Sequence, residues 1–471
     1  MTIVSAATTD GFPLVEELVP PPDAEAAFLR IAGRPHALFL DSARRDSKLG
    51  RYSFLTADPF DVFTARADEP DLLLRFAERV AKYRAATAPE LPPFQGGAAG
   101  LLSYELAHAI EKLPASANPE TNLPALAFGW YDVVLAYDHA AHRAWIISHG
   151  FPETAPKARR KRAEARLREF ATWLHEPPPL FTSAVSAAKV DSGWNVPHVP
   201  GLVSDFSPEE YRAAIRRAID YIAAGDIFQV NLAQRLSFPA TDDARSLYLR
   251  LRDRNPATFM GWFDLGSTQI VSASPERFVQ VRNGRVETRP IKGTRPRMLR
   301  AEADLFLGEE LKQSEKDRAE NVMIVDLLRN DLSRVCRPES VRVTQLCGLE
   351  TYEYVQHLVS AVEGELEAGR SAVDLIAAAF PGGSITGAPK VRAMEIIAEL
   401  EPHARGAYCG SLGYFGFDGA ADLSILIRTL TCRDGLWTFP VGGGITAASQ
   451  PEREYEETWH KATGLLAALR L

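Results

Sequence analysis

The sequence is poor in cysteine. Only four cysteines occur among its 471 residues, and they form neither a CxxC pair nor another metal-binding spacing. Disulfide scaffolds, structural zinc sites and haem attachment are therefore disfavoured. We expect Cys336, Cys347, Cys409 and Cys432 to be reduced thiols in a cytoplasmic protein.

Long apolar runs and an excess of positive charge are also lacking. No run approaches the roughly 18 residues of a membrane span, and the N-terminus, MTIVSAATTDGF, lacks the basic segment and apolar core of a secretory signal. Lysine and arginine number 53 against 61 aspartates and glutamates, a net charge of −8. Because this balance gives no field for holding a polyanion, we expect neither a membrane nor a nucleic acid as partner.

The order of predicted elements favours an α+β fold. Helical periodicity covers 71–86, a basic and solvated helix is expected over 155–175, and a capping box starts a helix at Ser207. Residues 175–206 are predicted to be a linker, because they are rich in proline, serine and glycine. Long helices are expected near 302–334 and 452–470, and strands at 36–42, 144–150, 228–238, 268–274, 278–282 and 285–291. Regular βαβ alternation is missing, which argues for α+β.

The last of these helices carries two carboxylates and a lysine on one face. Glu454, Glu457 and Lys461 are spaced i, i+3 and i+7. Neighbouring carboxylates repel unless a positive charge lies near them; Lys461 partly supplies it, and a divalent cation would supply it better. Glu320, on an earlier helix, lies beside an apolar stripe. Carboxylates from two helices suit Mg²⁺, although the spacing alone favours a solvated acidic surface.

Glycines cluster at PGGSITGAPK (381–390) and VGGGIT (441–446). Neither segment is a phosphate loop, because Gly387 is followed by Ala-Pro-Lys, and no GxGxxG follows a strand. A turn explains the second cluster. Its glycines would also allow backbone N–H groups to approach a carboxylate ligand.

Two more side chains are candidates for covalent or acid–base chemistry. Lys292, in PIKGTRPR (290–297), could be a nucleophile if a desolvated pocket or another cation lowers its pKa. Glu276, in SPERF (274–278), is a candidate acid. Lys292 could equally be a lysine that faces solvent, and Glu276 a glutamate in a turn. The residues alone do not distinguish these structural roles from the chemical ones.

Taken together, these motifs resemble the chorismate-utilising enzymes, the family of anthranilate, aminodeoxychorismate, isochorismate and salicylate synthases. Residues 207–471 carry the family motifs in family order, and GRYSFL (50–55) after FLDS (39–42) extends the resemblance toward the N-terminus. The matching stretches are GDIFQVNLAQR, SPERF, PIKGTRPR, AENVMIVDLLRNDLSRV, VQHL, GSITGAPK, RGAYCGSLGYF, IRT, GGGIT and EREYEET.

The resemblance implies an α+β fold in which two large antiparallel sheets form a sandwich, with peripheral helices and the site in a cleft. Residues 201–471 correspond to the chorismate-binding catalytic domain. Residues 1–200, with the linker near 175–206, correspond to an N-terminal region that contributes strands to the sandwich.

The family also implies a Mg²⁺ site that holds the ring carboxylate of chorismate. Glu320 and Glu457 correspond to the metal ligands, and Glu454 lies close by. The implied backbone contacts to the same carboxylate come from Gly442, Gly443 and Gly444.

The remaining roles concern the other end of the substrate and the proton transfer. Arg428 and Tyr408 correspond to the residues that bind the enolpyruvyl carboxylate, for which arginine gives a bidentate grip. Glu276 corresponds to the general acid that protonates the departing 4-hydroxyl group, which requires a raised pKa. His357, in the QHL motif, is implied to lie near the substrate ring. Pocket-lining positions are implied for Thr294, Thr386 and Lys461.

Two positions distinguish the branches of the family. The branches that add water carry a lysine base where this chain has Gln229. Glutamine cannot act as that base, so Gln229 is expected to be a substrate-binding residue. The anthranilate branch reads PIAGT where this chain reads PIKGT, the pattern of the aminodeoxychorismate branch. In that branch the lysine, here Lys292, attacks carbon 2 of chorismate, and ammonia then attacks carbon 4 and expels it. Asn321 fits the same branch.

The resemblance therefore implies a transferase of the aminodeoxychorismate branch, serving 4-aminobenzoate and folate synthesis with ammonia from a separate glutaminase subunit. Because the sequence ends soon after the helix of Glu457, a fused glutaminase or lyase is not expected. Asp41 and Ser42 replace the Glu-Ser of the tryptophan-sensing site, so tryptophan regulation is not expected. An anthranilate synthase component and a non-catalytic partner of a glutaminase are the alternative hypotheses.

Overall fold

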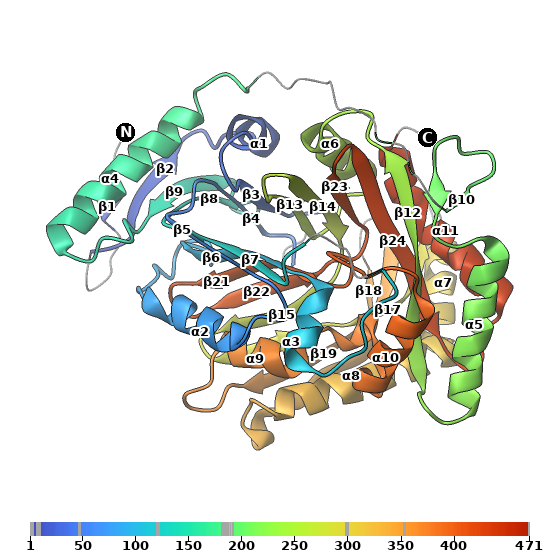
Figure 1. Cartoon of the computed structure of the whole chain (residues 1–471). Helices are drawn as coiled ribbons and strands as arrows, with labels where there is room; N and C mark the ends of the chain where they lie inside the picture. The colour runs from blue at the N-terminus through green and yellow to red at the C-terminus, as the bar shows by residue number, and fades with distance from the viewer. Residues whose placement is uncertain are drawn as a thin grey trace.

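Two antiparallel sheets, packed face to face, form the frame of the molecule in the computed structural model (Figure 1). It describes residues 4–5, 11–45, 49–118, 123–179, 188, 190, 193–296, 301–351 and 355–469. Within these residues the larger sheet has 14 strands and the smaller sheet 10. The predicted α+β sandwich is confirmed.

The larger sheet mixes strands from both ends of the chain. Its strands, in spatial order, are β1 (Val4–Ser5), β2 (Leu14–Leu18), β9 (Arg143–Ser148), β8 (Val133–Asp138), β4 (Tyr52–Thr56), β3 (Leu38–Asp41), β13 (Phe259–Asp264), β14 (Thr268–Ser274), β23 (Thr429–Arg433), β24 (Leu436–Ile445), β12 (Gln229–Pro239), β11 (Val203–Ser204) and β10 (Trp194–Asn195), with β20 (Gly387–Ala388) paired to β12.

The smaller sheet is built in the same way. Its strands, in spatial order, are β17 (Ile291–Pro296), β19 (Val355–Glu365), β16 (Arg285–Thr288), β15 (Arg277–Arg282), β22 (Ala421–Ile425), β21 (Ser411–Gly416), β6 (Gly97–Leu102), β7 (Leu126–Tyr131) and β5 (Asp61–Ala65), with β18 (Arg342–Thr351) paired to β19.

Helices cover the outer faces of the two sheets. Figure 1 shows α1 and α4 outside the larger sheet and α2, α8 and α9 outside the smaller one. The α-helices of the described chain are α1 (Ala24–Ile31), α2 (Leu72–Lys82), α3 (Ala107–Ile110), α4 (Pro156–Trp173), α5 (Pro208–Ala223), α6 (Ala244–Arg254), α7 (Ala301–Gln313), α8 (Glu315–Ser333), α9 (Ala372–Ala379), α10 (Lys390–Leu400) and α11 (Pro451–Ala468). None of them is long and apolar enough to cross a membrane.

Strand alternation on β3 shows how the layers are held together. Phe39 faces outward and stacks on Phe28 of α1, with ring centroids 5.4 Å apart. Leu38 faces inward and packs between the sheets with Leu101 and Leu412. Because successive side chains of a strand point to opposite faces, β3 contributes side chains both to the apolar layer under α1 and to the apolar layer between the sheets.

The chain on either side of residue 200 contributes to both sheets. β3 pairs with β13 in the larger sheet, and β6 pairs with β21 in the smaller one. The predicted linker is partly structured, since β10 and β11 lie within it, and part of it lies outside the described residues.

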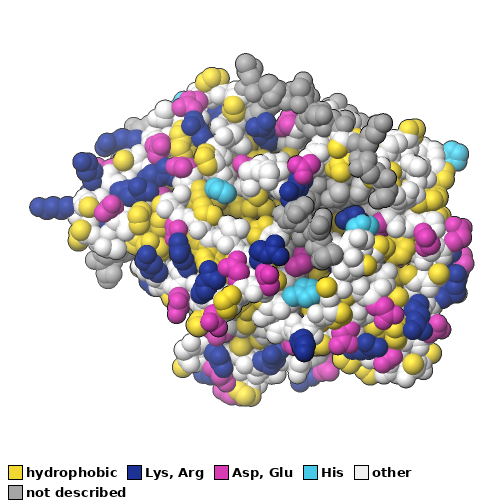
Figure 2. Space-filling model, viewed as in Figure 1, with side chains coloured by type: hydrophobic (Ala, Val, Ile, Leu, Met, Phe, Trp, Pro, Cys, Tyr) yellow, Lys and Arg dark blue, Asp and Glu magenta, His cyan; other side chains and the backbone are white. Residues whose placement is uncertain are grey.

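Two predicted helices differ from expectation. The single helix expected over 302–334 is divided into α7 and α8, because Ser314 caps α8 by accepting a hydrogen bond from the backbone N–H of Asp317. The basic helix α4 is not wholly solvated. Arg166 is buried and pairs with Asp58 at 2.8 Å and with the buried Asp132 at 3.3 Å, while other basic side chains gather over α4 at the left edge of Figure 2.

Candidate active site

A cavity of about 660 Å³ opens where strands of both sheets meet helices α8 and α11. This volume lies within the range of small-molecule sites. Most of the side chains and glycines predicted to form the site lie along its wall: Glu276, Lys292, Glu320, His357, Tyr408, Arg428, Gly442, Gly443, Gly444, Glu457 and Lys461.

Four predicted residues lie elsewhere or are only partly described. Gln229 and Thr386 are buried behind the wall, where the Thr386 hydroxyl donates to the carbonyl of Gly382 at 3.0 Å. Glu454 is 4% exposed and accepts a hydrogen bond from the Ser449 hydroxyl at 2.6 Å. Thr294 pairs through its backbone with His357, and its side chain lies outside what the structure describes.

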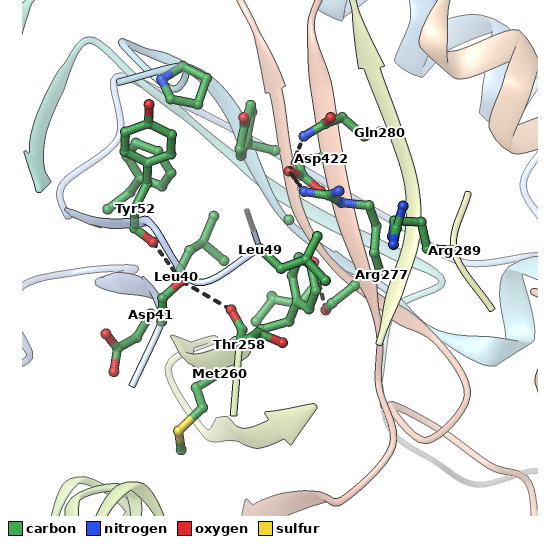
Figure 3. Close-up of a pocket in the computed structure, with 18 of the residues that line it drawn as sticks. Leu40, Asp41, Leu49, Tyr52, Thr258, Met260, Arg277, Gln280, Arg289 and Asp422 are labelled. Atoms are coloured by element: carbon green, nitrogen blue, oxygen red, sulfur yellow. Dashed lines mark hydrogen bonds and ion pairs between the residues drawn. The ribbon is translucent and has the colours of Figure 1, made fainter. Parts of the chain in front are cut away.

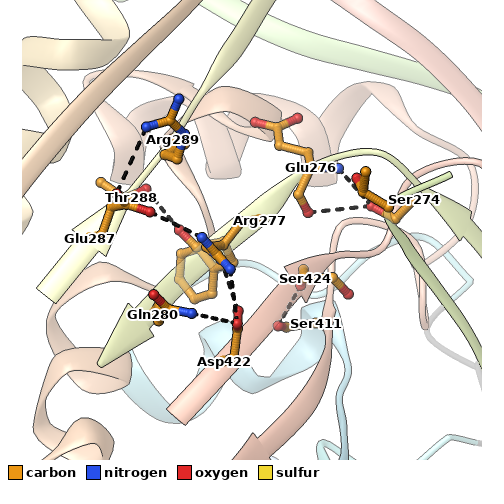
Figure 4. A network of polar contacts seen from close by, with 12 residues as sticks. Ser274, Glu276, Arg277, Gln280, Glu287, Thr288, Arg289, Ser411, Asp422 and Ser424 are labelled. Carbon is orange, nitrogen blue, oxygen red and sulfur yellow. Dashed lines mark hydrogen bonds and ion pairs between the residues drawn. The ribbon is translucent and has the colours of Figure 1, made fainter. Parts of the chain in front are cut away.

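Glu276 lies in the connection between β14 and β15 and is 4% exposed. The Ser384 hydroxyl donates to its Oε1 at 2.8 Å. Burial raises the pKa of Glu276, and the Ser384 hydrogen bond and the nearby Lys292 charge only partly oppose that rise. Figure 4 shows the Glu276 carboxyl directed away from the ion pair between Arg277 on β15 and Asp422 on β22. Because its pKa is raised, this carboxyl group keeps its proton to higher pH than an exposed glutamate, which suits a proton donor.

Lys292 is held close to Glu276 by the same residue. It lies on β17 opposite Leu358, and its Nζ donates to the carbonyl of Ser384 at 3.2 Å. Ser384 therefore contacts the candidate acid through its hydroxyl and the candidate nucleophile through its backbone. This arrangement brings both groups to one wall of the cavity.

The Ser384→Ala variant is expected to lower kcat by roughly tenfold or more, since a hydrogen bond to a charged or acidic group is lost. That hydrogen bond lowers the pKa of Glu276, so its loss raises the pKa further. The fall in rate at high pH should then move to higher pH. Rate–pH profiles measure this shift, and Ser384→Thr, which keeps the hydroxyl, should restore the wild-type profile. An unchanged profile in Ser384→Ala would show that Ser384 does not act on Glu276.

Arg428, Tyr408 and His357 form a second region of the wall. Burial holds the pKa of Tyr408 well above its ordinary value, so the phenol is neutral and can donate a hydrogen bond. Burial and the charge of Arg428 lower the pKa of His357 to about 3, so its imidazole is also neutral at working pH. Arg428 supplies a positive charge on the cavity wall, as a carboxylate-binding region requires.

The glycine segment of β24 forms the floor of the cavity. A Cβ at Gly442 would lie 2.4 Å from the carbonyl of Leu232, and one at Gly444 would lie 2.2 Å from Nε2 of Gln229. A Cβ at Gly443 would instead point among Lys461, Glu457 and Glu454. Backbone packing therefore requires glycine at Gly442. A side chain at Gly444 would have to displace the buried Gln229, and one at Gly443 would press against Lys461.

Carboxylates from two helices line the cavity. Glu320 comes from α8 and Glu457 from α11, and both line the cavity with Asp317. Oxygen donors of this kind suit Mg²⁺. In the described part of the chain, however, no three acidic, histidine or cysteine side chains are arranged to hold a metal. The carboxylates are therefore of the ligand type that Mg²⁺ prefers, but they are not arranged around one point as the ligands of a complete metal site would be.

Asn321 lies behind these carboxylates rather than beside them. Its side chain is fully buried, accepts a hydrogen bond from the Ser360 hydroxyl and donates to the carbonyl of Leu358 at 3.4 Å. These contacts fix α8 to β19 and so orient the preceding residue, Glu320.

Sequence reasoning missed several residues of the wall, chiefly Asn231, Asn255, Asp317 and Ser384. The Oδ1 atom of Asn231 is buried and accepts no hydrogen bond within the described residues, which leaves it available to a substrate donor. Its position inside an alternating strand, where inward side chains are normally apolar, was the signal that could have identified it.

A second cavity of about 400 Å³ lies on the other side of SPERF (Figure 3). Arg277 lines it, whereas the preceding Glu276 lines the first cavity. The Asp41 carboxylate at its edge is already bonded, to Arg252 at 2.7 Å, to Tyr248 at 2.9 Å and to Ser53 at 2.9 Å.

Comparison with known proteins identifies the family. The pattern of the chorismate binding enzymes matches residues 36–467. Anthranilate synthase component 1 of Thermus thermophilus is 41% identical over 464 residues, covering 94% of this chain and 95% of the relative. Aminodeoxychorismate synthase component 1 of Klebsiella aerogenes is 39% identical over 465 residues, covering 95% and 97%.

A solved structure supports the same conclusion. The crystal structure of anthranilate synthase component I from Streptococcus pneumoniae aligns with a TM-score of 0.76 at 32% identity, covering 89% of this chain and 93% of that one. The fold and the family are therefore shared with synthases of two kinds, whose identities to this chain differ by only two percentage points.

Proposed function

Because this chain belongs to the family of chorismate binding enzymes, we propose that it is the synthase component that converts chorismate and ammonia to 4-amino-4-deoxychorismate. The observation that carries the proposal is the position of Lys292 in the cavity beside Glu276, with Ser384 in contact with both. A lysine at this place supplies a nucleophile, which direct amination at carbon 2 does not need.

In the first step Nζ of Lys292 attacks carbon 2 of chorismate. The ring double bonds shift and the 4-hydroxyl group leaves with a proton from Glu276. The buried, raised pKa of Glu276 keeps that proton available. Arg428 and the Tyr408 phenol hold the enolpyruvyl carboxylate, so the ring is oriented between the acid and the nucleophile.

In the second step ammonia attacks carbon 4 and the bond between Lys292 and carbon 2 breaks. The lysine leaves as an amine, and the double bonds return to their first positions. Two successive displacements thus place nitrogen on carbon 4, the position from which the hydroxyl left. The ammonia source is a separate glutaminase subunit, and the product serves 4-aminobenzoate and folate synthesis.

Glu320 and Glu457, with Glu454 beside them, are the residues that would hold Mg²⁺ in this mechanism. The ion would supply positive charge for the ring carboxylate, and the glycine segment Gly442–Gly444 would give that carboxylate its backbone contacts. The contribution of the chain is to present carboxylate oxygens from α8 and α11 on the wall of one cavity.

Anthranilate synthesis is the second candidate. The identity to Thermus thermophilus anthranilate synthase component 1 favours it, because that value is as high as the identities to aminodeoxychorismate synthases. In that case Lys292 would line the cavity without taking part in the reaction. A non-catalytic role is disfavoured by the joint presence of Glu276, Lys292 and Arg428 in one cavity.

The purified chain should be incubated with chorismate, Mg²⁺ and ammonium, with and without aminodeoxychorismate lyase. We expect a non-fluorescent product that the lyase converts to 4-aminobenzoate. Fluorescent anthranilate formed without lyase would instead establish the second candidate. Chorismate left intact under both conditions would support the non-catalytic role.

A further inference from the structure

We infer that ammonia reaches the reacting ring from a third cavity, through a wall formed by the buried ion pair of Arg405 and Glu401. The inference rests on the proposed function in one respect, which is that ammonia is the second reactant. It gives ammonia an entrance of its own, apart from the active-site cavity of about 660 Å³ that receives chorismate.

The third cavity has a volume of about 810 Å³ and is bordered by α3, α10 and the segment before β7 (Figure 1). Many of its lining residues are apolar, and its polar groups include those of Tyr104, Glu105, Glu401 and Arg405. A cavity of this size with a few polar groups on an apolar lining is typical of a small-molecule site. The proposed steps at Glu276 do not use it.

Arg405 joins the third cavity to the active-site cavity. Its guanidinium group pairs with Glu401 at 2.6 Å and donates to the backbone carbonyls of Asn231 at 2.6 Å and Ile385 at 3.0 Å. Arg405 and Glu401 line the third cavity, whereas Asn231 and Ile385 line the active-site cavity. The two cavities are therefore separated by residues that contact one another directly.

Polar atoms without partners lie on both sides of this ion pair. The Tyr104 hydroxyl belongs to a residue that lines the third cavity, and Oδ1 of Asn231 to one that lines the active-site cavity. Both atoms are buried and make no hydrogen bond within the described residues, and the same is true of Oε2 of Glu105. Because buried polar groups are normally paired, these atoms would stabilise a small polar molecule that passes between them.

Ammonia has the hydrogen-bonding groups that these atoms lack. Its N–H groups can donate to Oδ1 of Asn231 and to Oε2 of Glu105. Its lone pair can accept from the Tyr104 hydroxyl, which stays protonated because burial raises the pKa of Tyr104. Ammonium has no lone pair, and the permanent charge of Arg405 would repel it. The wall therefore favours the neutral molecule, which is the nucleophile.

The route ends where the 4-hydroxyl group leaves in the proposed reaction. Nδ2 of Asn231 donates to the carbonyl of Ile385 at 3.2 Å. The preceding residue, Ser384, contacts both Glu276 and Lys292. Ammonia that passes Asn231 would thus arrive near the general acid while chorismate fills the active-site cavity. Its passage requires the guanidinium group of the wall to move aside.

A purely structural ion pair, which ties the segment after α10 to β12, is the simpler explanation of the Arg405 contacts. It does not account for the cavity of about 810 Å³ on the outer side of the pair. Nor does it account for the unpaired hydroxyl of Tyr104 and the unpaired amide oxygen of Asn231 on its two sides. Entry of ammonia through the active-site cavity itself is the other alternative, and kinetics separate the two routes.

The test is steady-state kinetics of the full chain with varied ammonium chloride at saturating chorismate and Mg²⁺. Tyr104→Phe removes only the unpaired hydroxyl and should raise the KM for ammonia about three- to tenfold, the effect of losing one hydrogen bond. Ala398→Trp places a large ring on the lining of the third cavity and should raise this KM as well. The KM for chorismate, and chorismate binding measured by calorimetry, should stay at the wild-type values in both variants.

Val391→Trp is the matched control, because it places the same ring on α10 at a position that is 37% exposed and outside the lining of the third cavity. An unchanged KM for ammonia in both Tyr104→Phe and Ala398→Trp would overturn the inference and leave the proposed reaction intact. An equal rise in the control, or an equal rise in the KM for chorismate, would overturn it as well.

The identity of the product separates this inference from the proposed function. Anthranilate as the product would overturn the proposed function alone, because ammonia is consumed in either reaction and the comparison of KM values still decides the route. Failure of the wild type to form any ammonia-dependent product would overturn both.

Discussion

The Lys292→Ala variant is expected to lose carbon-4 amination of chorismate by at least about a thousandfold in kcat, the scale seen when a nucleophile is removed. Lys292 Nζ is held in the cavity by the Ser384 carbonyl at 3.2 Å, and alanine provides no atom that can attack carbon 2. The measurement is the rate of 4-amino-4-deoxychorismate formation with saturating ammonium. Ammonium is used so that the result does not depend on the glutaminase.

Lys312→Ala is the control for this experiment, since Lys312 lies on α7 and pairs with Glu309 at 2.7 Å. It should retain wild-type activity. Binding of chorismate to Lys292→Ala should be measured alongside, because a folded variant that still binds substrate isolates the chemical step. Full carbon-4 activity in Lys292→Ala would show that the lysine is not the nucleophile.

The Glu276→Gln variant is expected to lower kcat by about 10²- to 10⁴-fold, the usual contribution of a general acid. Glutamine has almost the same shape and can still accept the hydrogen bond from Ser384, but it cannot supply a proton. Glu456→Gln, at an exposed position of α11, is the matched control. A Glu276→Gln enzyme as fast as the wild type would exclude Glu276 as the acid.

The pH dependence gives a second test of Glu276. Burial raises its pKa, so the carboxyl group keeps its proton to higher pH than an exposed glutamate. The acid is active when protonated, so the wild-type rate at constant free ammonia should fall as pH rises through this raised pKa. In Glu276→Gln this fall should disappear, because no group remains to lose the proton. A wild-type rate that does not fall at high pH would contradict the assignment.

Local patterns in the sequence were sufficient to predict much of the framework. The capping box at Ser207 and Glu210 begins α5 as expected, and the alternating residues 268–274 form β14 with the predicted bounds. Such features depend on neighbours a few residues apart. The family motifs, in turn, located most of the cavity wall, although their spacing alone left a solvated surface as the better explanation of the acidic helix.

The errors have a common cause, which is contact between residues far apart in the chain. Ser384 and Asn231 became recognisable only when β12, β14, β17 and the loop after α9 were brought together. Gln229 shares the strand of Asn231, yet it lies behind Gly444 and outside the cavity wall. Arg166, predicted on a solvated face, is buried because Asp132 and Asp58 come to it from other elements.

The position of nitrogen on the product ring tests the central claim most directly. The chain is incubated with chorismate, Mg²⁺ and ¹⁵N-ammonium, and the carbon bonded to ¹⁵N is identified by NMR. The account predicts ¹⁵N on carbon 4, in 4-amino-4-deoxychorismate. Nitrogen on carbon 2, as in anthranilate, would contradict the role given to Lys292 and would make this chain an anthranilate synthase component with the same fold.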